Sequence, residues 1–79
     1  MNESFHMEWK SEYFAVYVEV LKNGERVSIT FRKAPPTVFF PNFQYALRYV
    51  KQLNEETKRL FDTLLKMQEK AKKVREMMK

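Results

Sequence analysis

The chain has 79 residues with no cysteine, one histidine (His6) and one glycine (Gly24). This composition excludes disulfides, cysteine-ligated zinc, a multi-histidine metal site within one chain and a glycine-rich phosphate loop, and we expect no cofactor. A domain of this size buries only about 60% of its unfolded surface, so self-association is the expected source of added stability. Fifteen Lys and Arg against ten Asp and Glu give a net charge of +5, which favours a polyanionic partner.

The first ten residues do not resemble a targeting segment. They carry Glu3 and Glu8 and no long apolar run, unlike a signal peptide. No stretch of the chain reaches the roughly 18 apolar residues of a membrane span, so we expect a soluble, cytoplasmic protein with no membrane partner.

Apolar and polar side chains alternate over residues 5–10, with Phe5, Met7 and Trp9 against His6, Glu8 and Lys10. This alternation predicts either a third strand of a sheet or an extension of the first strand.

Residues 13–33 are predicted to form a β-hairpin. Asn23 and Gly24 both tolerate the positive φ of a type I′ turn, and they separate two alternating apolar segments. A turn at these two residues sets the expected register, in which the pairs are Lys22 with Glu25, Val20 with Val27, Val18 with Ile29, and Val16 with Phe31.

Alternation along the two strands sorts their side chains into two faces. The expected core face consists of apolar residues: Phe14, Val16, Val18, Val20, Val27, Ile29 and Phe31. The opposite face, called the outer face below, combines tyrosine, arginine and hydroxyl side chains: Tyr13, Ala15, Tyr17, Glu19, Arg26, Ser28, Thr30 and Arg32.

Proline ends the hairpin and closes the next segment. Pro35 and Pro36 cannot donate a backbone hydrogen bond, so the ladder is expected to stop at residues 34–36. Residues 37–40 are predicted to form a short edge strand that Pro41 closes. We expect both phenylalanines of this strand to seal the sheet against a helix; they are Phe39 and Phe40.

The second half carries an apolar series with heptad spacing. Ten of its eleven members are apolar: Phe43, Ala46, Val50, Leu53, Thr57, Leu60, Leu64, Met67, Ala71, Val74 and Met78. With Asn42 as N-cap, one continuous helix 42–78 would be about 55 Å long, against about 30 Å for the hairpin, so its end should project and need a partner. The alternative is a break at Asn54, whose following carboxylates Glu55 and Glu56 suit a second helix start, giving helices 42–53 and 55–78.

The expected architecture is therefore a single α+β domain, residues 1–79, with a sheet part (1–41) and a helical part (42–79) that forms a coiled coil. We expect a dimer or tetramer held by residues 55–79, because the apolar stripe is wider than a dimer seam. A parallel dimer would bring Lys70 towards Arg75 of its partner, which favours an antiparallel or four-helix arrangement. The predicted oligomerisation residues are Leu53, Leu60, Phe61, Leu64, Met67, Ala71, Val74 and Met78.

No constellation of residues supports catalysis. His6 has no expected Ser, Asp or Cys partner, and the adjacent Glu55 and Glu56 diverge on a helix, where they suit its dipole. The outer face favours a non-catalytic, sequence-independent platform for single-stranded nucleic acid, with stacking aromatics, phosphate-neutralising cations and hydroxyl donors. Its predicted residues are Trp9, Lys10, Tyr13, Tyr17, Arg26, Ser28, Thr30, Arg32 and Lys33.

Three other interpretations stay open at this point. The outer face could be an ordinary amphipathic sheet, since Tyr and Thr are common in strands. The chain could be a protein–protein interaction module, or a regulator of duplex DNA that inserts the hairpin into the major groove. The C-terminal lysines could simply form the solvated side of a coiled coil.

One known family shares this pattern. A basic and aromatic antiparallel sheet followed by a zipper-like helix resembles the ThermoDBP-related single-stranded-DNA-binding proteins of thermophilic archaea. The resemblance covers most of the chain as an architecture and rests on the heptad series over 43–78 together with Tyr13, Tyr17, Arg26, Arg32, Phe39 and Phe40. It implies an archaeal, thermophilic protein that binds single-stranded DNA without sequence preference, in a cleft of mixed apolar and basic side chains.

Overall fold

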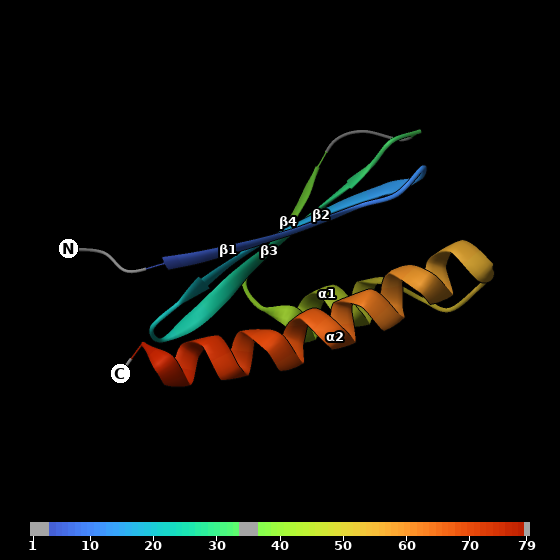
Figure 1. Ribbon diagram of the computed structural model, residues 1–79. Coiled ribbons are helices and arrows are strands. Elements are labelled where there is room, and N and C mark those ends of the chain that lie inside the picture. The colour runs from blue at the N-terminus through green and yellow to red at the C-terminus, as the bar shows by residue number, and fades with distance from the viewer. Residues whose placement is uncertain (1–3, 34–36, 79) are drawn as a thin grey trace.

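A sheet lies over a layer of two helices in the computed structural model, which describes residues 4–33 and 37–78 (Figure 1). The sheet is antiparallel, with its four strands side by side in chain order: β1 (Ser4–Lys10), β2 (Phe14–Leu21), β3 (Gly24–Phe31) and β4 (Val38–Phe40). Helices α1 (Phe43–Tyr49) and α2 (Glu55–Met77) cover one face of this sheet. The predicted α+β class, the third strand and the short edge strand are confirmed, whereas Pro35 and Pro36 lie outside the described residues.

Alternation along β2 and β3 produces the predicted core face. All of its members are buried or partly buried, and Val16, Val18 and Val20 are fully buried. They pack against apolar side chains from both helices, mainly Phe43, Ala46, Leu60, Leu64 and Met67. β-Branched residues suit this role because they hold one rotamer and fit a pleated, half-buried surface.

The predicted hairpin register is wrong by two residues. Leu21 pairs with Gly24, so the turn is formed by Lys22 and Asn23, and Gly24 begins β3 with a φ outside the left-handed region. A shift of two residues leaves every side chain on its own face, so apolar patterning does not distinguish the two registers. The observed register places Glu25 opposite Val20, on the inner face of the sheet.

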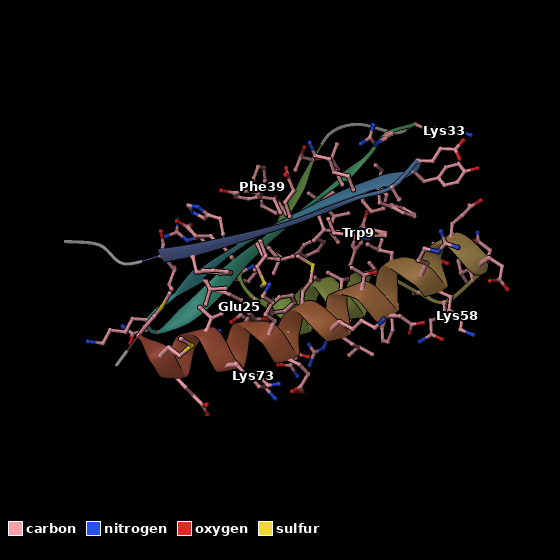
Figure 2. The ribbon with its side chains drawn as sticks, viewed as in Figure 1. Trp9, Glu25, Lys33, Phe39, Lys58 and Lys73 are labelled. Carbon is pink, nitrogen blue, oxygen red and sulfur yellow. The ribbon has the colours of Figure 1, made fainter. Side chains whose placement is uncertain are left out.

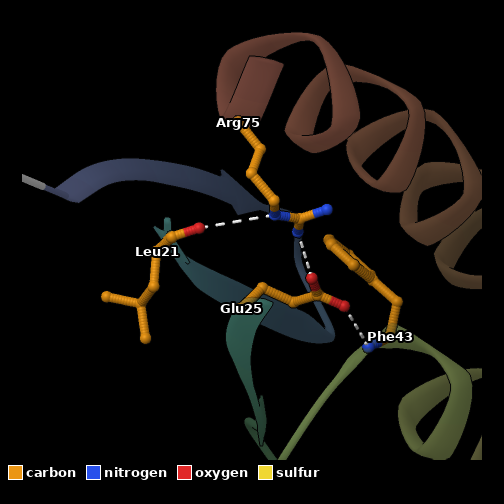
Figure 3. A network of polar contacts seen from close by, with 4 residues as sticks. All are labelled: Leu21, Glu25, Phe43 and Arg75. Carbon is orange, nitrogen blue, oxygen red and sulfur yellow. Dashed lines mark hydrogen bonds and ion pairs between the residues drawn. The ribbon is translucent and has the colours of Figure 1, made fainter. Parts of the chain in front are cut away.

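Glu25 joins the hairpin tip to both helices (Figure 3). Its Oε2 atom accepts a hydrogen bond from the backbone N–H of Phe43 at 3.0 Å, at the start of α1. Its Oε1 atom forms an ion pair with Arg75 of α2, and the Arg75 Nε–H donates to the Leu21 carbonyl oxygen at 3.3 Å. The last turns of α2 are therefore held on the β2–β3 turn.

The predicted continuous helix is wrong, and the alternative with a break at Asn54 is confirmed. Asn42 caps α1 as expected, by accepting from the N–H of Tyr45 at 3.1 Å. The Asn54 side chain accepts from the N–H groups of Glu56 and Thr57, both at 3.0 Å, and Thr57 Oγ1 accepts from the Asn54 N–H at 3.0 Å. This reciprocal cap satisfies N–H groups at the start of α2 and stabilises a new helix there. The chain reverses between the helices, and α1 ends earlier than expected, at Tyr49.

The C-terminal end of α2 does not project as expected, because Arg75 holds it on the β2–β3 turn. At 1.5 Å per residue α2 is about 35 Å long, and the longest dimension of the whole molecule is 38 Å. Four predicted oligomerisation residues, Leu60, Leu64, Met67 and Ala71, are buried in the core of the same chain. Phe61, Val74 and Met78 are partly buried against that core, and Leu53 is exposed in the connection between the helices.

The heptad series is thus used within one chain, and no coiled coil is shown. A 3.5-residue repeat drifts only about 20° per heptad from an ideal helix, or roughly 60° over the length of α2. That drift stays within the apolar stripe of at least about 100° that a helix presents to a sheet. The sequence pattern therefore suits a coiled coil and packing on a sheet equally well. Burial of the series on the chain's own sheet corrects the prediction that these residues hold an oligomer together.

Candidate nucleic-acid interface

The outer face of the sheet is not covered by either helix (Figure 1). Its middle row runs across the strands, because Tyr17 pairs with Ser28 and Ser28 pairs with Phe39. The two rings of this row are accessible, with Tyr17 44% and Phe39 78% exposed. The uncovered face therefore presents two aromatic rings, one on β2 and one on the edge strand β4.

Phe39 corrects part of the prediction for β4. Phe40 is buried and seals the core as expected, but Phe39 lies on the side of the sheet turned away from the helices (Figure 2). Neighbouring residues of a strand point to opposite faces, so two consecutive phenylalanines could not both face the core. That alternation was the sequence signal that would have placed Phe39 among the site residues.

A shallow groove of about 440 Å³ lies between these rings. Tyr17, Arg26, Ser28 and Phe39 line it together with Pro41, the residue after β4. The Ser28 hydroxyl lies 3.5 Å from the Tyr17 carbonyl oxygen. The groove thus combines two ring faces with one guanidinium group, one hydroxyl group and the carboxylate of Glu19. The rings, the guanidinium and the hydroxyl are contacts that a stacked base and its phosphate can use.

His6 supports Tyr17 from the neighbouring strand. Its ring stacks on Tyr17 with centroids 5.5 Å apart and an interplanar angle of 28°, and its Nε2 atom lies 3.5 Å from Glu19 Oε2. The sequence alone indicates no partner for His6. The pairing of β1 with β2, which brings His6 opposite Glu19, gives it this role.

Charge on the outer face is nearly balanced. Two basic residues, Lys10 and Arg26, share this face with two acidic ones, Glu8 and Glu19. Lys10 Nζ lies 3.6 Å from Glu8 Oε2. The basic surplus belongs instead to residues 42–79, which carry ten basic and five acidic side chains. Part of it lies on α2, in the opposite layer, as Lys58 and Lys73 show in Figure 2. The exposed basic residues of this helix are Lys58, Arg59, Lys66, Lys70, Lys72 and Lys73.

The structure gathers some predicted site residues and separates others. Tyr17, Arg26 and Ser28 line the groove, and Lys10 and Thr30 share its face, with Thr30 Oγ1 2.7 Å from Thr37 Oγ1. These outer-face positions follow from the alternation that was predicted.

Trp9 and Tyr13 do not join the outer-face groove. Trp9 lies between the sheet and the helices, packed against the core (Figure 2). Tyr13 precedes β2 and lines a small pocket with residues at the start of α2, under the Lys33 ammonium, which is 5.0 Å from its ring centroid. Arg32 and Lys33 are exposed just beyond the end of β3.

Within 4–33 and 37–78, no three His, Cys, Asp or Glu side chains lie together as a metal site. None of the helices in these ranges is long and apolar enough to cross a membrane. Comparison of the chain with protein-family models, with curated proteins and with solved structures finds no match.

Proposed function

We propose that this protein binds single-stranded nucleic acid without catalysing a reaction, and that the outer face is the binding surface. The observation that carries the proposal is the pair of exposed rings, Tyr17 and Phe39, in one row of an uncovered sheet. Stacking of a base on such a ring contributes about 1–3 kcal/mol and tolerates any base, because every base has a π-face.

The row sets the path of the strand. Tyr17 and Phe39 lie two strands apart, so about 10 Å separates them at the usual strand spacing of ~4.8 Å. Arg26 lies in the next row on one side, and Lys10 and Thr30 lie in the row on the other side. A strand that runs across the sheet can therefore place one base on each ring and bring its phosphates towards both cations.

The balanced charge limits the affinity and its salt dependence. Each phosphate contact to a single strand contributes about −0.7 to the slope of log affinity against log salt. Contacts to Lys10, Arg26 and Arg32 would give a slope of about −2, whereas binding along the six exposed basic residues of α2 would give about −4. The slope thus distinguishes the two surfaces.

DNA is the preferred strand in this proposal, because the sheet resembles that of the ThermoDBP-related proteins. The zipper part of that resemblance does not support the proposal, since the heptad series packs within the chain. The interpretation with a hairpin in the major groove has less support, because β2 and β3 are the two central strands and are not a free two-stranded ribbon.

The test is a fluorescence anisotropy titration of a labelled oligothymidine, at ~50 mM salt and above. Tyr17→Ala and Phe39→Ala should each weaken binding by about 5- to 150-fold, and should affect a duplex of equal length less. The matched control is Tyr45→Ala, which removes a tyrosine of similar exposure from α1 in the other layer. Failure of the wild type to bind, or an equal loss in Tyr45→Ala, would contradict the proposal.

A further inference from the structure

The outer side of β1 is an open edge of the sheet. β1 has seven residues and pairs only with β2 among the described residues, whereas the other edge strand, β4, has three residues and is followed by Pro41. Natural proteins usually blunt such an edge with a proline, a bulge, charged side chains or a covering segment, because free N–H and C=O groups invite another strand. The charged groups of Glu8 and Lys10 in β1 lie 3.6 Å apart and partly neutralise each other. β1 contains no proline, and its seven residues pair with β2 without a bulge.

The hydrogen bonds show which backbone groups of β1 are free. Just before β2, the carbonyl oxygen of Tyr13 accepts from the Arg32 N–H on the β3 side, and in β2 the carbonyl oxygen of Phe14 accepts from the Ser11 N–H on the β1 side. Alternation along an antiparallel ladder then directs the even-numbered residues of β2 towards β1. Their partners are the odd-numbered residues Phe5, Met7 and Trp9, so the N–H and C=O groups of the even-numbered residues point outward: Ser4, His6, Glu8 and Lys10.

These four residues are complementary to a second copy of the same strand. In antiparallel pairing about a two-fold axis at Met7, His6 lies opposite Glu8 of the other copy and Ser4 lies opposite its Lys10. The free N–H and C=O groups of all four residues then meet those of the opposite residues in the other copy, as the hydrogen-bonded pairs of an antiparallel ladder require. A shift by two residues in one direction would place Glu8 opposite Glu8, and like charges directly opposite each other are unfavourable. A shift in the other direction would place His6 opposite His6 and remove the pairing of His6 with Glu8 and of Ser4 with Lys10.

The inner face of the same edge is also self-complementary. Two-fold pairing brings Phe5 opposite Trp9 of the other copy and Met7 opposite Met7. In one chain these side chains overhang a groove of about 400 Å³ between β1 and α2, where Lys70 Nζ lies 5.7 Å from the Phe5 ring centroid. Aromatic pairs across strands are stabilising, and the second set of rings covers apolar surface that one chain leaves open.

We infer that two copies of this chain pair through their β1 strands and form one continuous eight-stranded sheet. Isologous contact about a two-fold axis is the commonest symmetry of soluble oligomers. This interface supplies the self-association that the length of the chain suggested, and it leaves the residues of the heptad series in the core. It also aligns two outer faces on one sheet, so a bound strand can contact both copies.

The decisive variant is Glu8→Pro. Proline at this position removes an outward N–H and none of the β1–β2 hydrogen bonds, and proline is tolerated on an edge strand whose N–H faces solvent. Light scattering should give the mass of two chains for the wild type and of one chain for Glu8→Pro, with an unchanged circular dichroism spectrum. Glu8→Gln, which keeps the N–H, should remain a dimer and serves as the matched control.

Cysteine crosslinking tests the register, because the natural chain contains no cysteine. In the inferred pairing His6 and Glu8 of different copies have Cα atoms about 5.5 Å apart, within the range of a disulfide. Two copies of the same residue lie roughly 8 Å apart on the diagonal, beyond that range. An oxidised mixture of His6→Cys and Glu8→Cys should therefore form the mixed dimer, while either variant alone, or Ser28→Cys, should not.

A wild type that stays monomeric at every concentration would overturn the inference, as would a dimer that persists in Glu8→Pro. Equal crosslinking of each cysteine variant with itself would overturn the register. These outcomes are independent of the proposed function, because the monomeric Glu8→Pro variant retains Tyr17 and Phe39 and should still bind oligothymidine. Loss of dimer with retained binding thus supports both proposals separately.

Discussion

Leu53 and Leu64 offer a direct test of how the heptad series is used. Both belong to the same apolar series, so a coiled coil would use them in the same way. In the structure Leu64 is 0% exposed and packs under the sheet, whereas Leu53 is 79% exposed in the connection before α2. The same substitution, leucine to alanine, should therefore have very different effects at the two positions.

The size of the difference follows from burial. Truncation of a fully buried leucine to alanine costs about 2–5 kcal/mol, from lost transfer free energy and the cavity left behind. A chain of this length has a total stability of only about 4–12 kcal/mol. Leu64→Ala should thus lower the melting temperature by at least about 8 °C, at about 4–8 °C per kcal/mol. Leu53→Ala, at an exposed site, should change stability by no more than about 0.5 kcal/mol.

Urea and thermal unfolding, followed by circular dichroism at one protein concentration, measure both variants against the wild type. The Glu8→Pro background allows the comparison in a variant for which we expect a monomer. A cost of about 2 kcal/mol or more for Leu53→Ala would refute the reasoning, because it would mean that the exposed leucine is buried in an assembly. A loss below about 1 kcal/mol for Leu64→Ala would equally contradict its place in the core.

Two further predictions concern the contacts that position the helices. Glu25→Ala leaves the Phe43 N–H without its acceptor and Arg75 without its carboxylate, so urea unfolding should show a loss of about 2–4 kcal/mol. Glu25→Gln keeps an acceptor and should lose about half as much; unchanged midpoints for both variants would rule out this role. Asn54→Ala removes the cap of α2 and should cost about 1 kcal/mol, while Asn54→Asp stays within a few tenths. Amide hydrogen exchange at Glu56 and Thr57 checks the cap, and equal protection in wild type and Asn54→Ala would contradict it.

Local chemistry accounts for much of what the sequence predicted. The alternation in β2 and β3 assigned each side chain to its face, because that assignment depends only on the period of a strand. Asn42 and Asn54 marked helix starts for a similar reason, since a cap is formed by a side chain and N–H groups two or three residues away. The same alternation predicted part of the site. Tyr17, Arg26 and Ser28 line the outer groove because they alternate with core residues along β2 and β3.

Features that depend on distant residues were predicted incorrectly or incompletely. The hairpin register has two solutions that preserve the faces, and the observed one brings Glu25 to α1 and α2. As an aromatic residue near basic ones, Trp9 is predicted on the binding surface, but the pairing of β1 with β2 places it over the core. The support of Tyr17 by His6 likewise requires that pairing.

By itself, the sequence determined the two strands of the hairpin, their faces and the two helix caps, all of which rest on interactions within a few residues. Tertiary structure alone decided where the apolar stripe of α2 is buried. A stripe of this width fits a partner helix or the chain's own sheet, and the reversal before Asn54 lets α2 reach the sheet without a partner. The length and charge of the chain pointed to self-association and a polyanion; the structure leaves β1 and the outer face as the surfaces that can provide them.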